Sequence, residues 1–178
     1  MTGVQTCALP ICSVARRNFL LTILRLATER EELRIVSDQV GAPTCASDVA
    51  ATTTKILCTI CDRSDRGFGF SEVSGTYHMS AAGQTTWYDF AKTILEKAEA
   101  TSRGLEWLAA ATQGRRLMAR RVIPVSTEEF GSPTPRPAYS ILSNSSLNQT
   151  FGVALPDWHD QLQGCFVSDL IAAKRAAD

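Results

Sequence analysis

Tyr88 and Lys92 are the first residues of this sequence whose types and spacing allow acid–base chemistry. They lie four positions apart, in the order Tyr-x-x-x-Lys, so on a helix their side chains share one face. Geometry alone therefore permits a catalytic pair. The competing interpretation is structural, with a tyrosine packed against the core and a lysine in solvent.

A second candidate is Cys58 and Cys61, which form a Cys-x-x-Cys motif. Two sulfurs at this spacing can hold a zinc ion or carry out thiol chemistry. A zinc site needs more ligands, but no second Cys-x-x-Cys follows and the sequence has only two histidines, His78 and His159. We therefore predict no metal site, two small apolar residues on a helix, and reduced thiols at all six cysteines.

Phosphate binding can use clustered arginines or a glycine-rich turn. Gly67 and Gly69 have no third glycine in phase and no preceding strand, so they do not form a dinucleotide-binding loop. A solvated helix face accounts for the arginine cluster without any ligand. The arginines of this cluster are Arg115, Arg116, Arg120 and Arg121.

The composition is that of an ordinary globular chain of 178 residues, with 44% hydrophobic and 20% charged residues. Lys and Arg together number 18, as do Asp and Glu, so no net charge favours nucleic acid or an anionic membrane as a partner. No apolar stretch approaches the ~20 residues that cross a bilayer. These features predict a soluble, cytoplasmic protein that binds neither nucleic acid nor membrane.

Hydrophobic periodicity predicts alternating helices and strands, which is typical of an α/β protein. His78, between Tyr77 and Met79, is predicted to be a packed histidine on a buried strand. The expected elements are, in chain order, a helix over 17–32, a strand over 33–36, a loop over 38–44, a helix over 48–61 capped by Ser47, a loop over 62–74, a buried strand over 75–80, a helix over 87–100 capped by Thr86 with Asp89, a helix-compatible stretch over 101–121, a strand over 122–125, a proline-rich loop over 126–137, and two C-terminal helices capped by Asn144 and Asp157.

Four blocks of the sequence resemble dTDP-4-dehydrorhamnose reductases, which belong to the extended short-chain dehydrogenases/reductases. The first is RNFLLTILRLATEREELRIVSDQVGAPT over 17–44, and the second is GTYHMSAAGQTTWYDFAKTI over 75–94. The third, RPAYSILSNSSL, spans 136–147, and the fourth, TFGVALPDWHDQL, spans 150–162. The blocks follow one another in the order of the family and cover most of residues 17–162.

The resemblance implies hydride transfer from NADPH or NADH to the 4-keto carbon of dTDP-6-deoxy-L-lyxo-4-hexulose, which gives dTDP-L-rhamnose. In the family, this chemistry uses a glycine loop that cradles the cofactor phosphates and a Tyr-x-x-x-Lys pair, both upstream of the matched blocks. Tyr88 and Lys92 correspond instead to a later helix, so we favour the structural interpretation for them. We therefore expect no catalytic residue, no cofactor-binding residue and no firm NADPH or NADH binding in this chain. A role for Mg²⁺ and a homodimer of the intact enzyme are left open.

The first eleven residues, MTGVQTCALPI, resemble the translation of a sequencing-library adapter and lack the pattern of a signal or transit peptide. We expect residues 1–11 not to be native. Residues 12–178 are expected to be the C-terminal part of the reductase, inactive by itself. Its predicted fold is an incomplete Rossmann-type doubly wound domain plus a small C-terminal substrate-binding lobe, with exposed sheet edges that favour aggregation.

In this superfamily the C-terminal part closes over the nucleotide sugar, so the chemistry left to predict is substrate recognition. Arg136 stands between two prolines, a rigid setting that presents a guanidinium fork suited to a diphosphate. The alternative is a surface ion pair with Glu128 or Glu129. Tyr139 and Ser140 are expected to meet the thymine or the sugar hydroxyls.

A second candidate segment is the loop DQVGAPT over 38–44. Gly41 permits unusual backbone angles, and Pro43 biases Ala42 away from the helical region. Such a loop can hold polar groups toward a ligand, or it can simply connect two lobes. The further substrate-binding candidates are Asp38, Gln39 and Thr44 from this loop and Asn18 from the start of the first helix.

Two other functions remain open on the sequence. One is a non-catalytic nucleotide-sugar-binding or regulatory module, because related members of the superfamily act as subunits of partner proteins. The other is a related nucleotide-sugar epimerase or reductase that acts on another sugar. The DQVGAPT and RPAYS blocks favour rhamnose biosynthesis over this last option.

Overall fold

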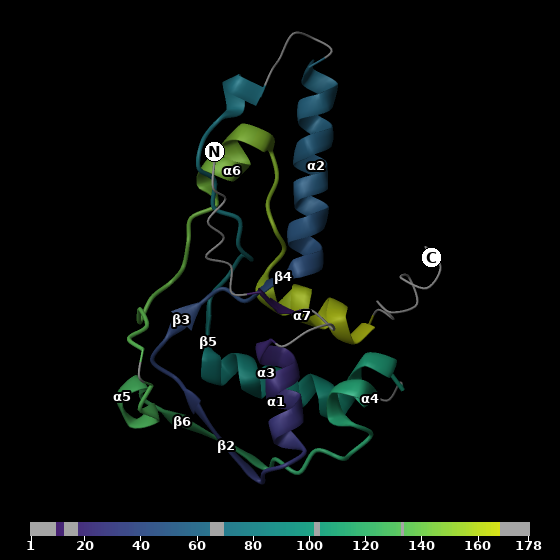
Figure 1. Ribbon diagram of the computed structural model, residues 1–178, viewed down its shortest axis with the longest axis vertical. Coiled ribbons are helices and arrows are strands. Elements are labelled where there is room, and N and C mark those ends of the chain that lie inside the picture. Colours follow the sequence, from purple (N-terminus) through teal and green to yellow (C-terminus); the bar gives the residue numbers. More distant parts are fainter. Residues whose placement is uncertain (1–9, 13–17, 65–69, 102–103, 133, 168–178) are drawn as a thin grey trace.

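The computed structural model describes residues 10–12, 18–64, 70–101, 104–132 and 134–167. They form two groups of elements (Figure 1). In one group, helices pack against a two-stranded sheet. In the other, a long helix stands beside shorter helical segments. The alternation of helices and strands confirms the α/β class.

The sheet consists of β2 (Glu32–Val36) and β6 (Arg121–Val125), which are parallel and in register along their whole length. Both strands were predicted. Parallel strands cannot be joined by a tight turn and need a long crossover. Here the connection includes α3 (Trp87–Ala100) and α4 (Glu106–Thr112).

Helices α1 (Phe19–Ala27), α3 and α7 (Trp158–Val167) share one hydrophobic core with the sheet. Phe90 of α3 is completely buried at the centre of this core. Its ring stacks on Phe19, with centroids 5.7 Å apart, and meets Trp158 edge-on at 5.8 Å. Three helices that are distant in the sequence are therefore joined through one aromatic side chain.

Local capping sets the helix boundaries. Thr86 accepts a hydrogen bond from the Asp89 N–H and begins α3, as predicted. Helix α1 is shorter than the helix predicted over 17–32. It ends at this point because the Thr28 hydroxyl donates to the Arg25 carbonyl and the chain turns away.

Two short strand pairs connect segments that are far apart in the sequence. β1 (Pro10–Cys12) lies parallel to β4 (Thr44–Cys45), and β3 (Val40–Gly41) lies antiparallel to β5 (Thr85–Thr86). The segment predicted as a loop over 38–44 therefore contains β3 and the start of β4. These strands were not predicted because their partners, β5 and β1, are distant segments that no local pattern indicates. Two of the first eleven residues belong to β1, and the other nine lie outside the described residues.

The second group contains α2 (Ala46–Ser64), η1 (Phe70–Val73) and α6 (Ser145–Phe151), which lie side by side in Figure 1. A separate, smaller core holds them together. Neither α2 nor any other helix in the described part of the chain is long and apolar enough to cross a membrane. The buried residues of the smaller core are Ile60, Val73, Leu147, Phe151 and Leu155.

The strand predicted over 75–80 is wrong. Residues 75–80 are all described, and they pair with no strand. The side-chain amide of Asn144 takes the place of a partner strand, since it accepts from the Ser80 N–H (3.1 Å) and donates to the Ser80 carbonyl (2.8 Å). Asn144 precedes α6 as predicted, but its side chain does not cap the helix. His78 is exposed, not packed.

The proline-rich loop predicted over 126–137 contains a one-turn helix, α5 (Thr127–Phe130). Ser126 accepts from the Glu129 N–H, and the Glu129 carboxylate accepts from the Ser126 N–H. This reciprocal capping box begins the helix. The Ser-x-x-Glu signal is present in the sequence, but the prediction of a proline-rich loop did not use it.

Candidate functional site

The structure brings together the two segments from which most of the site residues were predicted. The Val40 N–H donates to the Ala138 carbonyl (2.8 Å), and the Ser140 N–H donates to the Val40 carbonyl (2.9 Å). Residues 138–140 therefore run alongside β3, in a parallel bridge centred on Tyr139. Because β3 also pairs with β5, three segments distant in the sequence build one surface.

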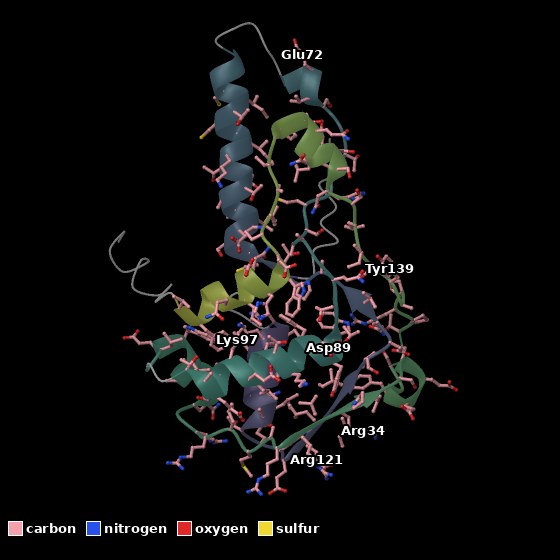
Figure 2. The ribbon with its side chains drawn as sticks, turned by 180° about the vertical axis from the view of Figure 1, so that it is seen from behind. Arg34, Glu72, Asp89, Lys97, Arg121 and Tyr139 are labelled. Atoms are coloured by element: carbon pink, nitrogen blue, oxygen red, sulfur yellow. The ribbon has the colours of Figure 1, made fainter. Side chains whose placement is uncertain are left out.

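Tyr139 is the most prominent side chain of this surface. It is 62% exposed, more than any other large apolar side chain in the described residues. Its hydroxyl donates to the Gln84 side-chain oxygen at 3.3 Å, and Figure 2 shows it at the outer side of the molecule. An exposed tyrosine offers both a flat apolar ring and a polar tip. Gln84 was not predicted, because no local pattern marks it as a neighbour of Tyr139.

Arg136 lies three residues before Tyr139 and is exposed. The ion pairs among the described residues join other partners. The alternative of a surface ion pair with Glu128 or Glu129 is therefore not formed in the described part of the chain. This guanidinium is accessible to an anion that approaches the surface beside Tyr139.

Ser140 and Gly41 pack closely against each other. The Ser140 hydroxyl donates to the Val40 carbonyl at 3.0 Å, so its oxygen keeps accepting capacity for a ligand hydroxyl. A Cβ atom added to Gly41 would lie only 3.1 Å from this hydroxyl oxygen. Glycine at this position therefore permits the close approach of the two segments.

Asp38 and Gln39 anchor α5 at the end of β2. The Asp38 carboxylate accepts from the Thr127 N–H (2.9 and 3.0 Å) and from the Thr127 hydroxyl (2.7 Å). The Gln39 side chain donates to the same hydroxyl oxygen at 3.0 Å and is buried. Hydrogen bonds from Thr127 hold the pKa of Asp38 below its ordinary value. Both predicted site residues thus have a structural role that sequence did not indicate.

We expect Asp38→Asn to lower stability near neutral pH and to weaken its dependence on acid pH. A carboxylate with a depressed folded-state pKa stabilises the fold above its unfolded pKa, and this contribution disappears as pH falls through the folded value. Urea midpoints measured near neutrality and below pH ~4 check this for both proteins. An equal loss on acidification in Asp38→Asn and the parent would contradict it. Asp48→Asn, at an acid with no Thr127 contact, is the control.

Thr44 and Asn18 are also engaged within the protein. Thr44 is 2% exposed; its hydroxyl donates to the Ala42 carbonyl and accepts from the Ala81 N–H, both at 3.0 Å. The Asn18 side chain accepts from the Leu21 N–H at 3.0 Å and caps α1. These hydrogen bonds give both residues a structural role. Substrate binding by Thr44 and Asn18 stays a prediction.

The other candidates for chemistry lie apart from this surface. Tyr88 packs partly buried against the main core, and Lys92 is solvated and 3.9 Å from the Glu96 carboxylate. This arrangement agrees with the structural interpretation, in which the tyrosine packs against the core and the lysine lies in solvent. Cys58 and Cys61 are both exposed on α2. Within the described residues, no group of His, Cys, Asp or Glu is arranged to hold a metal ion.

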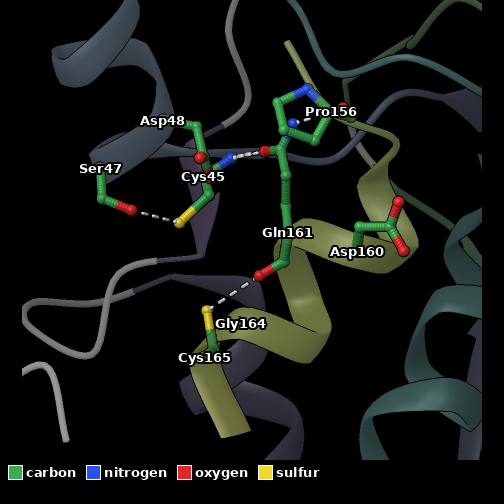
Figure 3. A pocket seen from close by; sticks show the side chains of 8 residues that line it. All are labelled: Cys45, Ser47, Asp48, Pro156, Asp160, Gln161, Gly164 and Cys165. Atoms are coloured by element: carbon green, nitrogen blue, oxygen red, sulfur yellow. Dashed lines mark hydrogen bonds between the residues drawn. The ribbon is translucent and has the colours of Figure 1, made fainter. Parts of the chain in front are cut away.

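A hollow of about 250 Å³ lies between the start of α2 and α7 (Figure 3), and sequence reasoning did not find it. Gln161, which is buried, joins its walls: its side chain accepts from the Cys45 N–H and donates to the Pro156 carbonyl, both at 2.7 Å. The neighbouring Cys165 thiol and burial raise the pKa of Cys45. A thiol kept protonated is a poor nucleophile. Because the Gln161 side chain also joins β4 to the start of α7, we assign this hollow a structural role.

Comparisons with known proteins agree on one family. Residues 11–170 match the RmlD substrate binding domain family. Among curated proteins, a dTDP-4-dehydrorhamnose reductase from Burkholderia thailandensis is 42% identical over 156 residues, which are 88% of this chain and 48% of that protein. The spore coat polysaccharide biosynthesis protein SpsK of Bacillus subtilis is 36% identical over 146 residues, 82% of this chain and 40% of that protein.

Solved structures give the same result. A dTDP-4-dehydrorhamnose reductase from Bacillus anthracis in complex with NADP aligns with a TM-score of 0.65 and 32% identity, over 86% of this chain and 44% of that one. An orthologue from Clostridium acetobutylicum aligns with a TM-score of 0.64 and 29% identity, over 88% of this chain and 45% of that one. The chain thus spans about half the length of the relatives it matches, and its fold corresponds to part of a Rossmann-type reductase.

Proposed function

Because the chain belongs to the RmlD substrate binding domain family, we propose that it provides dTDP-sugar recognition in a dTDP-4-dehydrorhamnose reductase. The observation that carries this proposal is the surface formed by β3, β5 and residues 138–140. The exposed aromatic ring of Tyr139 belongs to this surface, and the exposed Arg136 lies three residues before it in the chain. Those are the two groups that an anionic, base-bearing ligand requires.

The roles follow from the chemistry of each side chain. The Arg136 guanidinium forms charge-assisted hydrogen bonds with the diphosphate. The Tyr139 ring and hydroxyl contact the thymine, with Gln84 holding the phenol in place. Ser140 accepts from a sugar hydroxyl. Asp38 and Gln39 support this surface through α5, so they position the ligand-binding residues without needing to touch substrate.

NADPH or NADH is the expected hydride donor of the whole reductase, but the described residues do not fit a dinucleotide. Such a site needs a glycine-rich turn between a strand and a helix whose N-terminus faces the phosphates. β2 is followed by Asp38 and Gln39, whose side chains are both bonded to Thr127, and then by β3. Gly67 and Gly69 lie outside the described residues. The proposal therefore assigns recognition, and no hydride step, to this chain.

Three further elements of the proposal concern the whole protein. We propose the dTDP-4-keto-sugar as the substrate of the complete reductase and the cytoplasm as its location. A homodimer of the complete reductase stays open. Mg²⁺ is not assigned to any residue here, because no described cluster offers the oxygen ligands that this ion prefers.

We expect dTDP-L-rhamnose to bind this chain, with Arg136→Ala weakening the affinity roughly 10- to 100-fold, since a hydrogen bond to a charged group contributes about 1.5–3 kcal/mol. Isothermal titration calorimetry measures both dissociation constants. Arg115→Ala is the matched control, because Arg115 is also exposed but belongs to the connection after α4. Equal affinities for the parent and Arg136→Ala would remove Arg136 from the site.

A further inference from the structure

Two buried cysteines lie together in the main core. Cys45, on β4, is 3% exposed, and Cys165, on α7, is 2% exposed. Both line the hollow between the start of α2 and α7 (Figure 3), and the Cys45 side chain is hydrogen-bonded to that of Cys165. Both are present as thiols. The fold therefore brings together two sulfur atoms that are far apart in the sequence.

Neighbouring hydrogen bonds hold the two thiols in place. The Gln161 side chain accepts from the Cys45 N–H at 2.7 Å, so it fixes β4 on α7 one turn before Cys165. The Cys165 thiol donates to the Gln161 carbonyl at 3.5 Å, and the Cys45 sulfur lies 3.2 Å from the Ser47 hydroxyl oxygen. Because these contacts tie β4 to α7 beside both sulfurs, the thiols remain neighbours in the folded chain.

Besides its structural role, the hollow gives small molecules a route to this pair. Ser47 and Asp160 line it and are exposed, so the hollow reaches the surface. Its volume of about 250 Å³ is several times the roughly 30 Å³ that one water molecule occupies in the liquid. Two neighbouring thiols that an oxidant can reach are the starting material of a disulfide bond.

We propose that Cys45 and Cys165 form a redox site, in which a small disulfide such as oxidised glutathione converts the two thiols into one reversible disulfide between β4 and α7. The Cys165 sulfur gives up its proton, attacks one sulfur of the small disulfide and expels a first thiol. The Cys45 sulfur then gives up its proton, attacks the Cys165 sulfur and expels the second thiol. Two electrons and two protons thus pass from the protein to the oxidant, which is reduced to two thiols.

The order of attack follows from the surroundings of Cys45. The hydrogen bond with Cys165 and burial raise the pKa of the Cys45 thiol, so this thiol keeps its proton and is the slower nucleophile. Once the Cys165 sulfur carries the mixed disulfide, it lies beside Cys45. The second step is then intramolecular, which offsets the small thiolate fraction of Cys45. The product fastens β4, and with it the preceding loop over 38–44, to α7.

Peptide mapping after mild oxidation tests this redox site. The folded full chain is incubated with oxidised glutathione, the remaining thiols are blocked with iodoacetamide, and a non-reducing protease digest is measured by mass spectrometry. We expect two peptides joined through Cys45 and Cys165, which separate when dithiothreitol is added. The urea midpoint of the oxidised chain should lie about 1 M or more above that of the reduced chain, because a cross-link between distant positions restricts the unfolded chain.

Two variants sharpen the test. Cys165→Ser should abolish both the joined peptides and the difference in urea midpoint, whereas Cys58→Ser, at an exposed cysteine of α2, is the matched control and should preserve both. The peptide map of the parent chain needs no variant, so it decides the question even if Cys165→Ser does not fold. A disulfide from Cys45 to Cys12, which lies opposite it in β1, would overturn the redox site. Glutathione retained on Cys165, absence of the joined peptides, or equal midpoints for the oxidised and reduced chains would overturn it as well.

Discussion

Replacing Gly83 with alanine is expected to destabilise the fold by about 3 kcal/mol or more, from backbone strain, steric overlap and a lost helix cap together. Gly83 has φ +76°, and a Cβ atom there would overlap the Asp157 carboxylate and lie 3.1 Å from the Trp158 ring. That carboxylate cannot simply move away, because it accepts from the His159 N–H at 2.8 Å and caps α7. The backbone at residues 82 and 83 is thus packed directly against the start of α7, which leaves no room for a side chain at position 83.

Gly114→Ala separates steric overlap from backbone strain. Gly114 has φ +68°, close to that of Gly83, but a Cβ atom there would meet nothing within 4 Å. We expect this control to lose only about 1–2 kcal/mol. Urea unfolding followed by tryptophan fluorescence measures both variants. Equal losses of unfolding free energy in the two variants would contradict this prediction. They would show that the Asp157 side chain moves away from an added Cβ atom at little cost.

Phe90→Ala is expected to cost about 3–5 kcal/mol, the range found when a buried phenylalanine is truncated. Phe90 is completely buried and contacts rings from α1 and α7, so its loss leaves a cavity where three helices meet. The same urea experiment measures the effect. The unfolding curve of the variant is compared directly with that of the parent chain, because both contain the same three tryptophans.

Phe130→Ala is the matched control for this truncation. Phe130 is 56% exposed at the end of α5, and exposed substitutions usually change stability by no more than about 0.5 kcal/mol. A similar loss at positions 90 and 130 would mean that Phe90 does not organise the core.

Elements with strong local signals were predictable from the sequence. The β2 and β6 strands were located to within one residue, and Thr86 with Asp89 correctly marked the start of α3. Apolar periodicity and capping depend on neighbours a few positions away. The strand over 75–80 failed for the opposite reason. Its backbone partner is the side chain of Asn144, 64 residues from Ser80, and no local pattern encodes that pairing.

The candidate site shows the same division. Arg136, Tyr139 and Ser140 were chosen from a short segment, and the structure places Tyr139 and Ser140 beside β3. Gln84 was missed because its contact with Tyr139 spans 55 residues. The buried position of Thr44 was also missed, since only the folded chain brings the Ala81 N–H to its hydroxyl. Polar residue type alone does not distinguish a ligand contact from an internal hydrogen bond.

The most direct test of substrate recognition is a chimera in which the 156 matched residues of this chain replace their counterparts in the Burkholderia thailandensis reductase. NADPH oxidation in the presence of the dTDP-4-keto-sugar is measured for the chimera and for the parent reductase. We predict turnover with formation of dTDP-L-rhamnose, reduced by Arg136→Ala and unaffected by Arg115→Ala. A folded chimera that binds NADPH but leaves the dTDP-4-keto-sugar unreduced would contradict the assignment.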